Sequence, residues 1–213
     1  MSINILTSMF PNGFTKDFEK QLKRLITKRE KFVFVASEFD KNHDTNDYYY
    51  SHFLDMFVKI DIHFDNTYLI DSRTSKEVAQ RLIETADVIW LSGGDTPTQF
   101  NYLKSYGLLP FIKNSSGIII GMSAGSINMA KTAICTISCG HTEQKIYEGI
   151  GVVDIFVEPH FNNSDVSDEL LELSKQYSIY GMCDESLIIY ENEEPIFLGD
   201  IFLIENRTVK QIS

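Results

Sequence analysis

The chain of 213 residues is 43% hydrophobic and 23% charged, a composition typical of a soluble globular protein. Its net charge of −11 argues against a nucleic-acid partner, because phosphate binding requires clustered lysine and arginine side chains. The length suits one compact domain, so we expect residues 1–213 to form a single unit.

Five short apolar runs in the first 121 residues have the pattern of buried strands. Strands of a parallel sheet are apolar along their whole length because helices cover both faces. The runs are 3–7, 32–36, 67–70, 88–91 and 118–121. Three segments between them, 14–27, 47–58 and 75–84, place apolar residues at helical steps of three or four.

This alternation of strands and helices predicts an α/β fold, a three-layer sandwich around a mostly parallel sheet. The last thirty residues differ, since short strand-like runs there are separated by polar turns. We expect these runs to be antiparallel additions at the C-terminal edge of the sheet. They are 186–190, 195–198, 200–204 and 209–212.

The run 117–130 is the most informative for chemistry. An apolar strand ends at Gly121, small residues surround Ser123, and a helix-compatible stretch follows from Ala124. This is the strand–turn–helix context of a G-x-S-x-G nucleophile elbow, in which glycines relieve crowding in the tight turn. We therefore predict that Ser123 is the nucleophile of a serine hydrolase.

A serine nucleophile requires a general base, and His160 is the best candidate. It follows the strand-like run 152–157, which would place it at the same edge of the sheet as the elbow. His141 lies in a loop-like run and is a weaker alternative. The other histidines precede the elbow in polar or helical stretches, where surface or structural roles are expected.

A second glycine turn follows the run 88–91 and precedes a helix-start signal at Asp95 or Thr96. Backbone N–H groups at such a turn can bind a developing oxyanion. The N–H of Gly94, together with that of Ala124 after the nucleophile, is the expected pair. A phosphate-binding loop is the rival interpretation, but the run lacks the lysine and glycine spacing of such loops.

The motifs Ser-Gly-Gly-Asp-Thr, Gly-Met-Ser-Ala-Gly-Ser and Glu-Pro-His-Phe, in this order, resemble the dipeptidase E and cyanophycinase family of serine peptidases. His160 lies 37 residues after Ser123. The resemblance implies the fold of class I glutamine amidotransferases, which is flavodoxin-like. It also implies a serine-type peptidase, with His160 as general base and acid and the oxyanion hole at Gly94 and Ala124.

The acidic member of the triad has two candidates. Glu185 best matches the position of the histidine's partner in cyanophycinases, and its neighbour Asp184 is the alternative. Dipeptidase E uses an aspartate about fifteen residues after the serine, but Ser138 occupies that position here. An ordinary solvated turn before a strand is the competing interpretation of Asp184 and Glu185.

The substrate is less defined. Relatives that act on aspartyl substrates carry arginines after the Pro-His-Phe run, whereas this chain has none before Arg207. A guanidinium fork is the usual partner of a substrate carboxylate, so aspartyl preference and cyanophycin cleavage are not expected. We expect a small peptide as substrate and a monomer or homodimer.

The cysteines bear on compartment and metals. Three cysteines form no paired framework, which is typical of a reducing compartment. Cys135 and Cys139 have only His141 as an obvious third ligand nearby, whereas a zinc site needs four. Neither a signal peptide nor a membrane span is apparent. We therefore expect a cytoplasmic protein without membrane partner, metal or other cofactor.

Two other functional classes remain open. An α/β-hydrolase esterase also uses G-x-S-x-G, but it places its histidine late in the chain, and no histidine follows His160 here. A catalytically silent, amidotransferase-like binding domain would retain the fold without turnover.

Overall fold

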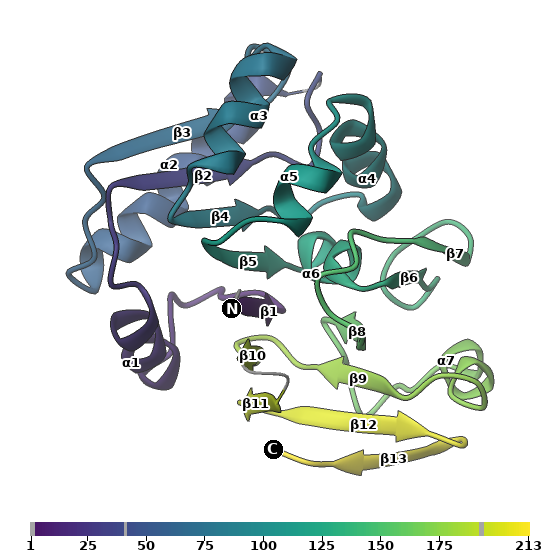
Figure 1. Cartoon of the computed structure of the whole chain (residues 1–213). Helices are drawn as coiled ribbons and strands as arrows, with labels where there is room; N and C mark the ends of the chain where they lie inside the picture. Colours follow the sequence, from purple (N-terminus) through teal and green to yellow (C-terminus); the bar gives the residue numbers. More distant parts are fainter. Residues whose placement is uncertain (1–2, 41, 192–193) are drawn as a thin grey trace.

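The structure is a computed structural model that describes residues 3–40, 42–191 and 194–213. These residues form a seven-stranded sheet with the order β11-β10-β1-β5-β4-β2-β3 (Figure 1). Strands β1 to β5 run parallel, while β10 and β11 are antiparallel additions beside β1. The strands of this central sheet are β1 (Asn4–Thr7), β2 (Lys31–Val35), β3 (Asn66–Ile70), β4 (Val88–Leu91), β5 (Ile118–Met122), β10 (Leu187–Glu191) and β11 (Glu194–Leu198).

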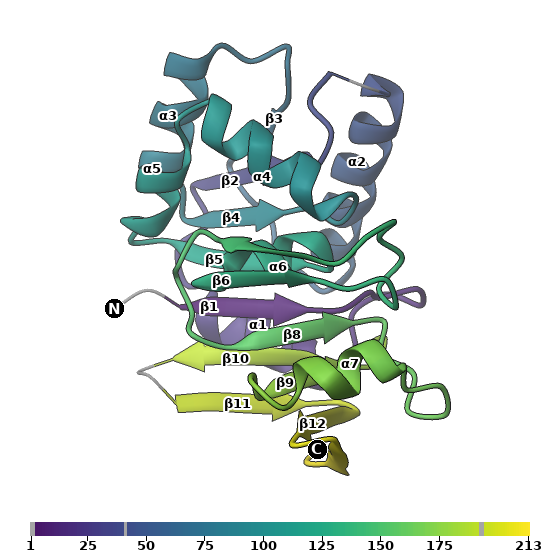
Figure 2. The ribbon, with the colours of Figure 1, turned by 90° about the vertical axis from the view of Figure 1, so that its right-hand side faces the viewer.

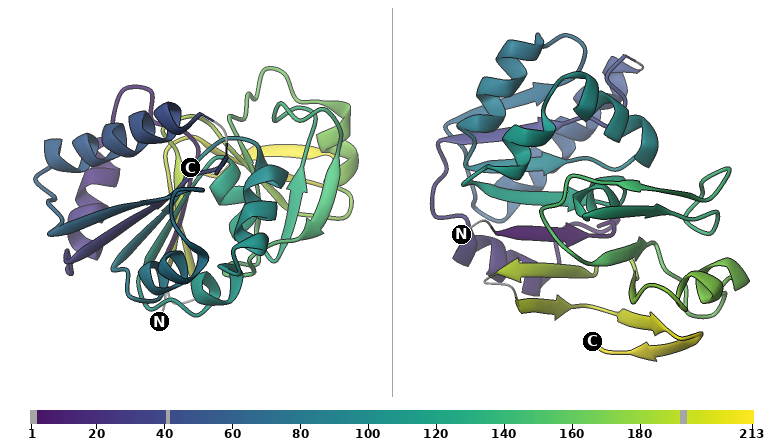
Figure 3. Two further views of the ribbon diagram at one scale, coloured as in Figure 1. Left: turned by 90° about the horizontal axis from the view of Figure 1, so that it is seen from above. Right: turned by 45° about the vertical axis from the view of Figure 1, so that its right-hand side comes forward.

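Helices cover both faces of the central sheet and complete a three-layer sandwich (Figure 3). Helices α1 (Lys16–Leu25) and α2 (His43–Lys59) pack on one face. The other face carries α3 (Lys76–Glu84), α4 (Thr96–Ser105), α5 (Leu109–Lys113) and α6 (Ala124–Met129).

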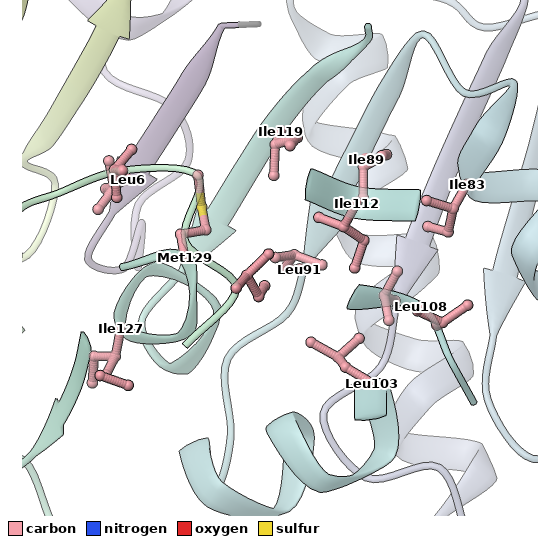
Figure 4. Packing of buried hydrophobic residues seen from close by; sticks show 14 of the residues in the cluster. Leu6, Ile83, Ile89, Leu91, Leu103, Leu108, Ile112, Ile119, Ile127 and Met129 are labelled. Carbon is pink, nitrogen blue, oxygen red and sulfur yellow. The ribbon is translucent and has the colours of Figure 1, made fainter. Parts of the chain in front are cut away.

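The core explains why the central strands are apolar throughout. Every residue of β1, β4 and β5 is buried, so alternate side chains enter opposite helical layers. Trp90 packs among the aromatic residues beside α2, whereas its neighbour Leu91 faces the opposite layer with Met129 (Figure 4). Complete burial of side chains of this kind contributes about 1.5–3 kcal/mol each to folding.

A second sheet lies beside the first. Within the described residues it contains four strands in the order β13-β12-β9-β8. Only β8 and β9 are parallel to each other. Figure 2 shows this sheet and helix α7 at the lower end of the molecule. Its elements are β8 (Phe156–Pro159), α7 (Asp168–Leu173), β9 (Ile179–Met182), β12 (Ile201–Glu205) and β13 (Thr208–Gln211), and the hairpin of β6 (Thr132–Cys135) and β7 (Lys145–Glu148) lies nearby.

The predicted α/β class and mostly parallel sheet are confirmed, with two corrections in detail. The runs 186–190 and 195–198 join the edge of the central sheet as expected, but the last two strands belong to the second sheet. The strand before His160 is β8, which starts only at Phe156 and also belongs to the second sheet. In the part of the chain that the structure describes, no helix combines the length and apolar character needed to cross a bilayer.

Candidate active site

The nucleophile elbow forms between β5 and α6. Ser123 has φ 50° and ψ −108°, a backbone conformation that residues with side chains rarely adopt. Its N–H donates to the carbonyl of Thr7 on the adjacent strand, 2.9 Å away. The hydroxyl of buried Ser126 lies 2.7 Å from the carbonyl oxygen of Gly121 and fixes the base of the turn. The strained serine is thus held from both sides.

The glycines of the motif are required by close backbone contacts. A Cβ at Gly121 would lie 2.7 Å from the carbonyl carbon of Gly125. A Cβ at Gly125 would lie 2.3 Å from the carbonyl oxygen of Leu91. Only glycine therefore allows β4, β5 and α6 to meet as tightly as the elbow demands.

His160 connects Ser123 to a carboxylate. Its Nε2 lies 2.9 Å from Ser123 Oγ, and its Nδ1 lies 2.8 Å from Asp184 Oδ1. The three side chains come from different segments: the end of β5, the end of β8 and the turn after β9. The His160 and Asp184 side chains are 38% and 46% exposed, so the arrangement opens to solvent. Its geometry is that of a Ser-His-Asp triad.

The expectation that Glu185 is the partner of His160 is corrected by this geometry. Glu185 Oε1 accepts a hydrogen bond of 2.8 Å from Asn12 Nδ2, and the Glu185 N–H donates to the Met9 carbonyl. Glu185 has φ 67°, in the left-handed region, and its carboxylate contacts Asn12 rather than His160. Of the two adjacent acids, the alternative candidate Asp184 is the one that contacts the histidine.

The second predicted glycine turn lies against Ser123. A Cβ at Gly93 would be 3.4 Å from Ser123 Cβ. Gly94 has φ 143°, and a Cβ there would lie 2.1 Å from Ser37 Oγ. Ala124 is the first residue of α6, where N–H groups have no acceptor within the helix. Within the described parts of the chain, neither the Gly94 N–H nor the Ala124 N–H donates a hydrogen bond to a protein group.

A cavity of about 310 Å³ opens beside the triad. Ser123 and His160 form part of its wall, together with the glycine turn at 93–94. Apolar side chains, among them Phe34 and Met122, alternate with polar ones around it. A space of this size accommodates a small peptide side chain or terminus next to the nucleophile.

The model of peptidase family S51 matches residues 6–198, which include the elbow, the glycine turn at 93–94, His160 and Asp184. The chain belongs to peptidase family S51. It is therefore a serine peptidase, and the family resemblance and activity class predicted from its motifs are confirmed.

Solved structures support the fold of this S51 chain. A peptidase from an acI-B1 Actinobacterium has a TM-score of 0.73 at 15% identity, over 100% of this chain and 94% of that one. A putative peptidase E from Listeria monocytogenes EGD-e has a TM-score of 0.65 at 17% identity, over 100% of both chains. A search of curated proteins found no match. The α/β-hydrolase alternative is set aside, because the match is to the S51 family.

Ser8 is a residue of the S51 site that motif analysis missed. It is fully buried, and its hydroxyl donates to Asp184 Oδ1 at 2.9 Å. The Ser8 Oγ also accepts a hydrogen bond of 2.9 Å from the backbone N–H of His160. One hydroxyl thus fixes both the carboxylate and the backbone of the histidine. Its position directly after β1, at the carboxyl end of a central parallel strand, is the signal that could have identified it.

A buried acid lies behind the site. Glu158 lies on β8, two residues before His160, and burial raises the pKa of Glu158 to about 7. Its carboxylate accepts hydrogen bonds from Thr136 at 2.7 Å and from Ser138 at 2.8 Å. Ser138 occupies the position at which dipeptidase E carries its triad aspartate, and here it contacts Glu158 rather than His160. The Glu-Pro-His-Phe motif includes Glu158 but does not reveal that this side chain is buried.

The remaining candidate side chains form a structural cluster. The His141 Nε2 lies 3.2 Å from the Thr96 hydroxyl, and burial lowers the pKa of this histidine. Cys135 and Cys139 are free thiols, and burial raises the pKa of Cys135 to about 11. In residues 3–40, 42–191 and 194–213, no group of three or more His, Cys, Asp or Glu is arranged to hold a metal ion.

Proposed function

We propose that this S51 peptidase hydrolyses small peptides through an acyl-enzyme on Ser123, with His160 as general base and Asp184 as the orienting acid. The observation that carries the proposal is the continuous line of hydrogen bonds from Ser123 Oγ through both ring nitrogens of His160 to Asp184. Activation of a serine hydroxyl requires a base at this distance and orientation.

The Asp184 carboxylate is an acceptor, so it favours the histidine tautomer with the proton on Nδ1. The Nε2 lone pair then faces Ser123 Oγ. As the hydroxyl attacks the peptide carbonyl, its proton moves to Nε2, and Asp184 stabilises the imidazolium that forms. The peptide C–N bond breaks when His160 returns this proton to the leaving amine. Water, deprotonated by the same histidine, then hydrolyses the ester and restores Ser123.

The proposed oxyanion hole consists of the Gly94 and Ala124 N–H groups. Two features support it: the glycine turn borders Ser123, and both N–H groups lack protein acceptors in the described chain. The N-terminal end of α6 adds a favourable field for negative charge at the nucleophile. Donors fixed in this way stabilise the tetrahedral intermediate without reorganisation during the reaction.

We propose a small peptide as the substrate, because the cavity beside Ser123 has a volume of only about 310 Å³. We also propose that residues 1–213 act as one catalytic domain, as a monomer or homodimer. The single-domain assignment is supported by the site, because its contacting residues are drawn from most of the chain, from Ser8 to Asp184. A cytoplasmic location and independence from cofactors stay predictions of the sequence.

A fluorophosphonate probe tests the nucleophile directly. The folded wild-type chain should be labelled at Ser123, as read by mass spectrometry of the intact protein and its peptides. Ser123→Ala should show no labelling and no turnover of a peptide library. Absence of labelling in the wild type, under conditions that label a control serine hydrolase, would instead support a catalytically silent domain.

A further inference from the structure

We propose that the S51 site selects peptides with an ammonium group, which binds the carboxylate of Glu38 in the cavity beside Ser123. This inference rests on the proposed function, because Glu38 matters only if Ser123 performs hydrolysis. The ammonium is the free N-terminus of the peptide or the end of a lysine side chain. Both sources present the same three N–H donors and one positive charge.

The charge of the cavity wall supports this assignment. Glu38 is half-buried and is the one acidic lining side chain among the described residues. The described lining residues include no lysine or arginine. In the same part of the chain, no basic side chain forms a salt bridge with Glu38. A cationic group would therefore find a partner in the cavity, whereas a carboxylate would be repelled.

The polar atoms around Glu38 favour a donor as the ligand. Asn46 is buried at the cavity wall, and its Nδ2 donates to the Glu38 carbonyl at 3.0 Å and to Asp71 Oδ2 at 3.3 Å. The amide nitrogen is thus occupied by protein acceptors, which leaves Asn46 Oδ1 as an acceptor. Thr45 adds a hydroxyl to the same wall. An ammonium ion, which has three donors and no acceptor, matches such a set.

The backbone that carries Glu38 is held by an ionic network. Asp71, which binds Asn46, is almost fully buried and pairs with Arg73 Nη2 at 2.7 Å. The same guanidinium bridges to Asp47 on α2 with two hydrogen bonds. This network connects the end of β3 to the start of α2, on which the cavity wall is built. The site for the ammonium is therefore organised before the substrate binds.

The test compares matched peptide substrates that differ in one charge. One pair is an alanyl dipeptide with a free or an acetylated N-terminus. A second pair is acetyl-lysyl and acetyl-norleucyl peptides with the same leaving group. We expect the cationic member of one pair to be cleaved with the higher kcat/KM, and the pair that shows this identifies the source of the ammonium.

Glu38→Gln should then lower kcat/KM for that cationic substrate by roughly 10- to 100-fold, mainly through KM, as expected for a hydrogen bond to a charged group. The uncharged partner substrate should be cleaved at an unchanged rate. Glu84→Gln removes the same charge from an exposed position at the end of α3 and serves as the matched control.

Two results would overturn the inference. The first is equal cleavage of charged and uncharged members in both pairs, and the second is an equal effect of Glu38→Gln on both members. Fluorophosphonate labelling of Ser123 is measured on every variant in parallel. If labelling is intact and one of these results is found, only the role of Glu38 is contradicted. Absent labelling in the wild type contradicts the proposed function.

Discussion

Asp184 lies 2.8 Å from His160 Nδ1, while the side chain of its neighbour Glu185 is bound by Asn12. Two adjacent acids in one turn thus face different partners. The turn is closed by the Ser186 N–H, which donates to the Cys183 carbonyl, and Glu185 takes its left-handed position. Backbone geometry, rather than the chemistry of either side chain, therefore decides which of the two acids contacts His160.

Asp184→Asn and Glu185→Gln test this arrangement as a pair. Asp184→Asn should lower kcat by roughly 10³- to 10⁴-fold, because an amide stabilises neither the required tautomer nor the imidazolium. Glu185→Gln should change kcat by no more than about twofold, because Gln still accepts from Asn12. Steady-state kinetics with the best library peptide measure both effects. A larger loss of kcat in Glu185→Gln than in Asp184→Asn would indicate that Glu185 is the orienting acid.

Much of the fold and part of the site could be predicted from the sequence. The central strands are buried on both faces, and continuous apolar runs therefore located them within one or two residues. Ser123 was identifiable because close contacts at Gly121 and Gly125 tie the motif to its backbone shape. Residues close together in the sequence therefore sufficed to locate these strands and Ser123.

Other features depend on contacts between distant segments. Ser8 contacts Asp184 across 176 positions of the chain. Its place after the first strand marks an edge of the sheet, but the residues around it do not reveal its partner. The assignment of the last two strands to a second sheet depends on pairing between β9 and β12 rather than on their apolar pattern. Likewise, the choice between Asp184 and Glu185 required the conformation of their turn.

Ser8→Ala should reduce kcat without a comparable change in KM. The substitution removes a hydrogen bond to the Asp184 carboxylate and leaves the His160 N–H without its acceptor. Loss of a hydrogen bond to a charged group corresponds to a decrease of roughly 10- to 100-fold. Ser115→Ala removes another buried hydroxyl, bonded to the Gly117 N–H far from the site, and should leave kcat unchanged. Equal losses in both variants would indicate a general structural effect.

Gly94→Ala tests the proposed oxyanion hole. The new Cβ would meet Ser37 Oγ at 2.1 Å in a backbone conformation with φ 143°, so the turn must shift. A displacement of the donor by about 1 Å corresponds to a loss on the order of 100-fold in kcat. Fluorophosphonate labelling should slow as well, because its anionic intermediate uses the same donors. Gly140 also has a positive φ, but a Cβ there would have no atom within 4 Å, so Gly140→Ala should retain activity. Full activity of Gly94→Ala would exclude Gly94 from the oxyanion hole.

Glu158 should make the stability of the peptidase depend on pH. Burial raises the pKa of Glu158 from 4.5 to about 7, so the folded chain retains a proton that the unfolded chain loses in this interval. The free energy of unfolding contributed by this group is therefore greatest below pH 4.5 and falls as pH rises to about 7. The difference amounts to about 3 kcal/mol.

Urea unfolding at pH 4.5 and 7.5 measures the Glu158 effect, because contributions of other carboxylates cancel when variants are compared. Glu158→Gln cannot ionise and still accepts from Thr136 or Ser138, so its stability should fall less than that of the wild type between these values. Glu148→Gln, at an exposed position of β7, should follow the wild-type dependence. If Glu158→Gln loses as much stability as the wild type over this interval, the buried carboxyl group does not titrate there, and the pH dependence has its origin elsewhere in the fold.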